Sequence, residues 1–259
     1  MRINSFNKSK RIVIKIGSSL LINNKGGVKK QIIKNIAGDI NKLINKNKEI
    51  IVVSSGAIAL GKNKLNLPEH IDLTQSQAAA ARGQIELITC WKNEFKKNNK
   101  QVAQILLSPS DTKNKKSSIN AVATIENLLQ LGCIPIINEN DTTATEEIKF
   151  GDNDILAARI TKLINADCLI LLSNVDGLYT SPPSKKEQSI LVKNVPSISK
   201  KIMAMAGEAS KHGKGGMISK IKAAEMCLKE RCSVIITSGL KENPIASLSK
   251  LSTKATRFN

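Results

Sequence analysis

The sequence predicts an α/β fold in which a mostly parallel central sheet carries helices on both faces, giving a three-layer αβα sandwich. Short runs rich in Ile, Val and Leu alternate along the chain with longer stretches whose apolar residues recur at helical spacing. The short runs are apolar almost without interruption, as expected of strands covered on both faces. No internal repeat and no linker rich in Pro, Gly or Ser interrupts the 259 residues. We therefore expect a single domain, residues 1–259.

Each expected strand ends near a glycine or small polar residues, and most are followed by an expected helix. The strands cover residues 11–16, 49–53, 102–107, 133–137, 168–172 and 233–236. The helices cover residues 29–45, 75–97, 117–131, 153–164 and 218–229, and a further helix begins after Gly56. Right-handed crossovers bring the carboxyl ends of parallel strands to one edge of the sheet, so we expect ligand-binding residues there.

The composition limits the classes of partner. The net charge of +19 would usually suggest nucleic acid, but the charge is nearly all lysine and aromatic residues are only 2%. We therefore expect no nucleic-acid role, whereas an anionic small substrate is compatible with the charge. No apolar run is long enough to span a membrane, and the N-terminus lacks the apolar region of a secretory signal. A cytoplasmic protein without membrane contact is expected.

The five cysteines are widely spaced, and several lie inside apolar runs. Cys227 and Cys232 have no histidine or second cysteine pair near them, which argues against zinc. The pattern favours free, buried thiols in a reducing compartment, and no metal site made by protein side chains is expected.

Two glycine-bearing turns follow the first two strands. Lys15 precedes Gly17, so an ammonium group lies beside backbone N–H groups that a phosphate could bind. Ser55 and Gly56 form a second candidate anion site. Residues 56–62 match the spacing of a phosphate-binding P-loop, but Asn63 replaces the required Ser or Thr and the glycines open into an apolar helix. We reject a P-loop and expect Gly61 to permit close helix packing.

The densest polar signal is the segment 138–145, Asn-Glu-Asn-Asp-Thr-Thr-Ala-Thr, followed by Gly-Asp-Asn-Asp at 151–154. Turn and N-cap preferences explain one or two of these residues, with Asp152 as the natural cap of the helix at 153. They do not explain so many polar groups directly after an apolar strand. Asp141 could bind an ammonium group, and the amides could bind carboxylates.

A glycine-rich loop at 212–217 leads into the last helix, with Lys220 in its first turn. A lysine there opposes the helix dipole unless an anion occupies the site, in which case lysine, amides and dipole all attract it. The alternative is a flexible loop followed by a solvated lysine. The histidines are isolated, and no catalytic role is expected for them.

Together these segments resemble the amino-acid kinase superfamily and, within it, the glutamate 5-kinases of proline biosynthesis. The resemblance runs from residue 11 to residue 258. Its most specific part is 138–154, and the segments VIKIGSS, SSGAIALG and GKGGMISK match the remaining elements in order. It implies transfer of the ATP γ-phosphoryl group, with Mg²⁺ held mainly by the nucleotide, to the γ-carboxylate of L-glutamate. The N-terminal half would mainly bind the acceptor and the C-terminal half the nucleotide.

The resemblance also implies roles for individual residues. Lys15 and Lys220 would contact the transferring phosphoryl group, and Asp154 would hold both lysines. The glutamate-binding positions are Ser55, Asp141 and Asn153. The nucleotide-binding positions are Lys15, Gly17, Ser173, Asn174, Lys214, Gly215, Gly216, Met217, Ile218, Ser219 and Lys220.

Two departures and several alternatives remain. The family usually carries Thr-Asp at 173–174 and Thr at 214, where this chain has Ser173, Asn174 and Lys214. A kinase with another small anionic acceptor, or a non-catalytic regulatory homologue, therefore stays open.

The chain ends where many members continue into a PUA domain, so we expect that module to be lacking. Relatives form dimers or tetramers, and hand-off of product to glutamyl phosphate reductase is a further expectation.

Overall fold

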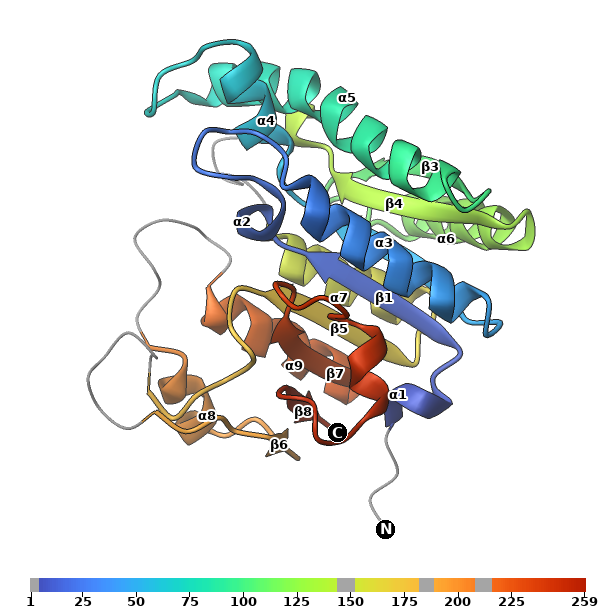
Figure 1. Cartoon of the computed structure of the whole chain (residues 1–259), viewed down its shortest axis with the longest axis vertical. Helices are drawn as coiled ribbons and strands as arrows, with labels where there is room; N and C mark the ends of the chain where they lie inside the picture. Colours follow the sequence, from blue (N-terminus) through green and yellow to red (C-terminus); the bar gives the residue numbers. More distant parts are fainter. Residues whose placement is uncertain (1–4, 144–151, 182–188, 208–215) are drawn as a thin grey trace.

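The computed structural model describes residues 5–143, 152–181, 189–207 and 216–259. Its strands form one eight-stranded sheet in the order β3-β4-β2-β1-β5-β7-β8-β6. Every neighbouring pair is parallel except β7 with β8, which is antiparallel. Helices cover both faces (Figure 1), which confirms the predicted three-layer architecture.

The predicted strands and helices are present with small shifts at their ends. The strands are β1 Arg11–Ile16, β2 Glu49–Ser54, β3 Gln101–Leu107, β4 Cys133–Glu139, β5 Cys168–Ser173, β6 Asn194–Val195, β7 Ser233–Ser238 and β8 Thr256–Phe258. The helices are α1 Ser5–Lys8, α2 Ser18–Leu21, α3 Lys30–Ile44, α4 Ala57–Lys64, α5 Leu73–Lys96, α6 Lys115–Gln130, α7 Asn153–Leu163, α8 Lys200–Met205 and α9 Met217–Lys229. Two 3₁₀ turns, η1 Asp141–Thr143 and η3 Ala246–Ser249, complete the described elements.

The two faces of the sheet bury separate apolar clusters. On one face, Ile12, Ile14 and Ile16 of β1 pack with residues of α3 and α5. On the other face, Val13 packs with residues of α6, α7 and α9. Side chains alternate between the two faces of a strand, so Lys15 faces the same side as Val13. The register of β1 therefore places a buried lysine under α7 and α9.

Two glycines let helices α4 and α5 pack backbone against backbone. A Cβ atom on Gly61 would lie 1.7 Å from the carbonyl oxygen of Ala79, and one on Gly83 would lie 1.8 Å from that of Ala57. No side chain fits at these distances. The prediction that Gly61 serves helix packing is confirmed, and residues 57–64 form helix α4 where a P-loop would require an open loop.

The prediction that residues 102–107 form a strand covered on both faces is wrong. β3 is the edge strand of the sheet and is partly exposed along most of its length. Its apolar composition resembles that of the central strands, so burial could not be read from it. The short strands β6 and β8 were not predicted, because two or three residues carry no measurable periodicity.

The cysteine prediction holds in part. The described cysteines are all free, but only Cys168, Cys227 and Cys232 are buried, whereas Cys90 and Cys133 are partly exposed. In the portion of the chain that the structure describes, no helix is both long and apolar enough to cross a membrane.

Candidate active site

The candidate site centres on one buried carboxylate that pairs with two lysines. Lys15 Nζ lies 2.6 Å from Asp154 Oδ1, and Lys220 Nζ lies 2.9 Å from Asp154 Oδ2. The carboxylate is fully buried, and the lysines are only 4% and 6% exposed. The predicted convergence of positions 15, 154 and 220 is confirmed by these distances.

Three elements deliver these side chains to the carboxyl edge of the sheet. Lys15 is the penultimate residue of β1, Asp154 is in the first turn of α7, and Lys220 is in the first turn of α9. Asp152 caps α7, because its side chain accepts a hydrogen bond from the N–H of Asp154 at 2.9 Å. The cap fixes the start of the helix and hence the direction of the Asp154 side chain.

A serine hydroxyl completes the partners of the central carboxylate. Ser219 Oγ donates to Asp154 Oδ2 at 2.7 Å. With a lysine on each oxygen as well, Asp154 has three described partners, two of them cationic. Burial alone would raise the pKa of Asp154, but the charges of Lys15 and Lys220 outweigh it and hold that pKa below its usual value.

The charges around this cluster favour an incoming anion. The two lysines and Asp154 sum to one positive charge, and Asp154 and Lys220 lie in the first turns of α7 and α9, where the helix dipole adds partial positive charge. Burial lowers the pKa of Lys220, against the opposing effect of Asp154. A Cβ atom on Gly17 would lie 3.7 Å from Lys15 Nζ, so the missing side chain leaves space beside that ammonium group.

A second polar group lies beside the first, one residue earlier on α7. Asn153 Nδ2 donates to Ser55 Oγ at 2.9 Å and to Asn138 Oδ1 at 3.1 Å. Asn138 Nδ2 in turn donates to Gln84 Oε1 at 2.8 Å. Two of the predicted glutamate-binding positions, Ser55 and Asn153, therefore contact each other directly.

Asp141 lies in η1, which follows β4 at the same edge of the sheet and packs against α5. Burial raises the pKa of its carboxyl group to about 6. Burial, followed by the charge of Asp154, also raises the pKa of Asp152. A partly buried carboxylate is a group that an ammonium ligand would stabilise.

The remaining predicted positions, those proposed for the nucleotide, lie at or just after the end of β5, at the start of α9 or outside the described residues. Ser173 ends β5 at the same edge of the sheet, and Asn174 follows it with an exposed side chain. Gly216 is the N-cap of α9, and Met217, Ile218 and Ser219 form its first turn with Lys220. Lys214 and Gly215 lie outside the described residues, as do 144–151 of the most specific segment.

Sequence reasoning missed Gln84 and did not assign Asn138 a role. Gln84 is a polar residue on the buried face of the Ala-rich helix α5, directly after Gly83. A buried polar side chain in such a stripe is a signal for a specific hydrogen bond. Its partner lies 54 positions away, so the sequence could not identify it.

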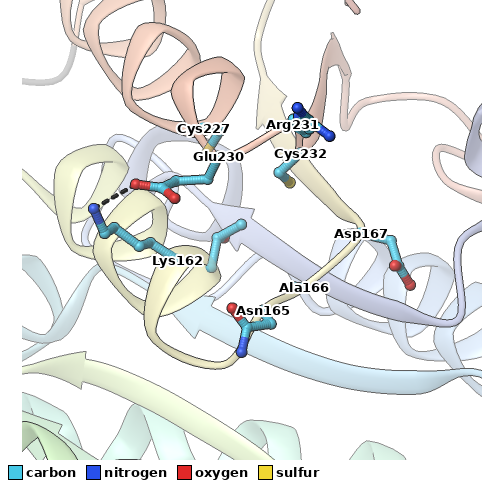
Figure 2. A pocket seen from close by; sticks show the side chains of 9 residues that line it. Lys162, Asn165, Ala166, Asp167, Cys227, Glu230, Arg231 and Cys232 are labelled. Atoms are coloured by element: carbon cyan, nitrogen blue, oxygen red, sulfur yellow. Dashed lines mark ion pairs between the residues drawn. The ribbon is translucent and has the colours of Figure 1, made fainter.

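A cavity of about 180 Å³ opens at the other end of the fold, near the C-terminal ends of α7 and α9 (Figure 2). Lys162 and Glu230, which form an ion pair, line it together with Cys227 and Cys232. The segments before β5 and β7 also line it, so it lies at the amino edge of the sheet. None of the predicted site residues that the structure describes is among those that line this cavity.

Comparisons with known proteins agree with this geometry. The model of the family described as "Amino acid kinase family" matches residues 10–238. A protein of Pelagibacter ubique (strain HTCC1062) named glutamate 5-kinase is 47% identical over 244 residues, which cover 93% of this chain and 66% of that protein. A glutamate 5-kinase of Sinorhizobium fredii is 48% identical over 93% of this chain and 62% of its own length. The chain thus spans somewhat less than two thirds of the length of these curated relatives.

Two solved structures share the fold at low sequence identity. The UMP kinase of Ureaplasma parvum superposes with a TM-score of 0.65 and 17% identity, covering 96% of this chain and 98% of that one. An isopentenyl phosphate kinase superposes with a TM-score of 0.67 and 15% identity, covering 96% and 100%. Because the family model covers most of the sequence and these structures share its architecture, the chain belongs to the amino acid kinase family.

Proposed function

We propose that this chain transfers the γ-phosphoryl group of ATP to the γ-carboxylate of L-glutamate, giving L-glutamyl 5-phosphate and ADP. The observation that carries the proposal is the pairing of Lys15 and Lys220 with the single carboxylate of Asp154 at the carboxyl edge of the sheet. The names of the relatives at 47% and 48% identity support glutamate as the acceptor.

The chemistry asked of the protein is mainly electrostatic. A carboxylate acceptor is ionised at neutral pH, so it needs no general base. The difficulty is bringing two anions together and stabilising the negative charge that spreads over the transferring oxygens. Lys15 and Lys220 are the groups that would contact those oxygens, and Asp154 would keep both ammonium groups in position.

The donor set also fits a nucleotide that carries its own metal ion. Both oxygens of Asp154 are already engaged by Lys15, Lys220 and Ser219, which leaves Asp154 poorly suited to bind Mg²⁺ directly. When bound, Mg²⁺ would neutralise part of the phosphate charge. Gly17, Ser173, Asn174 and the first turn of α9 would hold the nucleotide, with Lys214 and Gly215 as further candidates.

At the acceptor end, Ser55, Asp141 and Asn153 would bind glutamate. Asp141 would pair with the ammonium group, and Ser55 could donate its hydroxyl hydrogen to a carboxylate because its oxygen already accepts from Asn153. The proposed setting is a cytoplasmic homo-oligomer in proline biosynthesis. Its product is a reactive acyl phosphate that glutamyl phosphate reductase would consume.

The test is ADP release from MgATP with a panel of amino acids and small carboxylates, with hydroxylamine added to trap any acyl phosphate. Glutamate-dependent ADP release together with trapped γ-glutamyl hydroxamate supports the proposal. Turnover with a different acceptor identifies a related kinase. Absence of turnover with every acceptor points to a non-catalytic homologue.

A further inference from the structure

The hydrogen bonds around Asn153 fix which way its side-chain amide points. Its Nδ2 group has two hydrogens, and they are directed at Ser55 Oγ and Asn138 Oδ1. Its carbonyl oxygen, Oδ1, is buried and has no hydrogen-bond partner among the described residues. A buried acceptor left unpaired costs roughly 1–3 kcal/mol, so such an atom calls for a donor.

The orientation of Asn153 depends on a chain of amides. Reversing the Asn153 amide would place its oxygen against Asn138 Oδ1, where two acceptors repel each other. That arrangement is possible only if Asn138 reverses as well, and Asn138 now directs its Nδ2 at Gln84 Oε1. With Oε1 of Gln84 as its acceptor, Asn138 turns its own oxygen towards Asn153, so the observed direction of both asparagines follows from the direction of Gln84.

Gln84 is held in place by the backbone contact between α4 and α5. It follows Gly83, whose missing side chain lets α5 approach the carbonyl oxygen of Ala57. Ala57 begins α4 directly after Ser55 and Gly56. The same contact therefore sets the position of Gln84 and of the turn that carries Ser55.

We propose that Gln84 is a positioning residue for substrate specificity. Through Asn138 it presents Asn153 Oδ1 as a hydrogen-bond acceptor for the ammonium group of the amino-acid acceptor. The proposal rests on the proposed function and specifies which atom distinguishes an amino acid from the corresponding plain dicarboxylate. Asp141 would supply the charge that attracts the ammonium group, and Asn153 Oδ1 would supply a neutral, oriented acceptor.

Two substitutions of Gln84 separate positioning from mere packing. Gln84→Met has nearly the same length but no acceptor, so the asparagine chain loses its fixed direction. Gln84→Glu keeps an acceptor oxygen for Asn138 Nδ2 and should preserve the direction. Thr161→Val on α7 serves as a control, because its buried hydroxyl donates to the carbonyl oxygen of Ala157 in its own helix and lies at the opposite edge of the sheet.

The experiment measures kcat/KM for L-glutamate and for glutarate, which lacks the ammonium group, with each variant at saturating MgATP. We expect Gln84→Met to raise KM for glutamate about tenfold, corresponding to about 1.4 kcal/mol, with kcat nearly unchanged and no comparable loss for glutarate. Gln84→Glu and Thr161→Val should stay within about threefold of wild type in their preference for glutamate over glutarate.

The outcomes distinguish this inference from the proposed function. If wild-type protein phosphorylates glutamate but Gln84→Met keeps the full preference over glutarate, the positioning role is overturned and the proposed function stands. Equal losses with Gln84→Met and Gln84→Glu also overturn it, because they show that the acceptor atom is not what matters. If wild-type protein does not phosphorylate glutamate at all, the proposed function fails and this inference fails with it.

Discussion

Lys220 on α9 donates to Asp154 on α7 at 2.9 Å, although 66 positions separate the two residues along the chain. This bond ties the first turns of two helices together over the tip of β1. It also means that neither helix can shift along its axis without pulling an ammonium group away from the place where a phosphoryl group would be transferred.

Replacement of Lys220 by alanine tests the electrostatic role of this site. We expect kcat to fall by about 10²–10³, because one preorganised positive charge is lost from the transferring oxygens. The measurement is steady-state ADP release at saturating glutamate, with circular dichroism to verify the fold. Lys229→Ala at the exposed end of the same helix should leave kcat unchanged. A Lys220→Ala variant with near-normal kcat would exclude the assigned role.

Replacement of Asp154 by asparagine should change the dependence of stability on pH. The pKa of Asp154 is lowered in the folded protein, so its ionised form stabilises the fold above the unfolded value of about 3.9. That contribution is lost as the pH falls through the lower folded pKa. Losing the carboxylate also removes the buried ion-pair partner that Lys15 and Lys220 share, at a cost of about 3–5 kcal/mol.

The measurement for Asp154 is urea denaturation of both proteins at intervals from pH 7 to pH 3. We expect a large stability difference near neutral pH that narrows at the acid end. A difference that stays constant over the whole range contradicts the assignment of Asp154 as an ionised partner of the lysines.

Asp141 should make glutamate use sensitive to mild acid. Burial raises its pKa to about 6 in the free protein, so below that pH the group is largely neutral and cannot pair with an ammonium group. We expect kcat/KM for glutamate to fall up to about tenfold per pH unit below 6, with a weaker response in kcat. Asp141→Asn should have a low kcat/KM for glutamate at every pH, and its pH profile should lack this inflection. An unchanged inflection in the variant assigns it to another group.

The raised pKa of Asp141 also affects folding stability, which should fall as the pH rises, whereas kcat/KM for glutamate should fall as the pH is lowered. When the pKa of a carboxyl group is higher in the folded than in the unfolded protein, its ionisation disfavours the folded state. The free energy of unfolding therefore decreases as the pH rises from about 4 to about 6. Ligand-free Asp141→Asn protein should therefore melt at a higher temperature than wild type at pH 7.5. A lower melting temperature would mean that the ionised carboxylate contributes to folding.

Alanine at Gly61 or Gly83 should destabilise the protein strongly. The new methyl group would overlap a backbone carbonyl of the facing helix, and backbone cannot move aside as a side chain can. Overpacking of this kind costs about 1–3 kcal/mol or more. Gly38→Ala is the control, since nothing lies within 4 Å of the added atom and alanine favours a helix by about 1 kcal/mol. Equal melting temperatures for the Gly61 and Gly38 variants contradict the close contact.

The thiols should fall into two reactivity classes. Cys90 and Cys133 are partly exposed and therefore accessible to a reagent, although burial raises the pKa of Cys90. The other thiols are buried; burial raises the pKa of Cys168 to about 12, and a hydrogen bond with Cys227, together with burial, raises that of Cys232. A raised pKa lowers the fraction of reactive thiolate, so burial from the reagent and a strongly raised pKa both protect these thiols. Titration with a disulfide reagent should modify Cys90 and Cys133 in the native protein and the remaining thiols only after denaturation. Rapid reaction of Cys168 under native conditions contradicts this assignment.

Cys227 and Cys232 owe their proximity to the way α9 ends. Arg231 adopts a left-handed φ of 58°, and the N–H of Cys232 donates to the carbonyl oxygen of Cys227 at 3.1 Å. These are the features of a Schellman cap, which brings the side chains at its two ends into contact. The cap accounts for the proximity of the two thiols as a consequence of how the helix ends.

The sequence predicts those strands and helices that are recognisable from the local pattern of apolar and polar residues. Strand β1 and helix α3 are long and regular, and their ends lie within one residue of the expected positions. Residues 102–107 were placed correctly as a strand but not at the edge of the sheet, since strand order depends on contacts between distant segments. Strand β8 was missed because it is short and its antiparallel pairing with β7 has no sequence signature.

The candidate site likewise contains residues that local sequence identifies and residues that depend on contacts between distant segments. Lys15 and Lys220 were singled out because one lies near the end of an expected strand and the other in the first turn of an expected helix, whereas the role of Asp154 was implied by the family resemblance. Gln84 was missed because its hydrogen-bond partner, Asn138, lies on strand β4, far from helix α5 along the chain. Hydrogen-bond direction in a chain of amides cannot be read from residue order, since both ends of an amide side chain are compatible with the same sequence.

The position of β8 between β7 and β6 affects when the protein can finish folding during its synthesis. β6 joins the sheet only through β8, so residues 194–195 have no neighbouring strand until residues 256–258 have left the ribosome. The strands from β1 to β5 can assemble earlier, because their partners are made within the first 173 residues. A nascent chain stalled before residue 256 is therefore expected to hold an ordered first half and an incomplete second half.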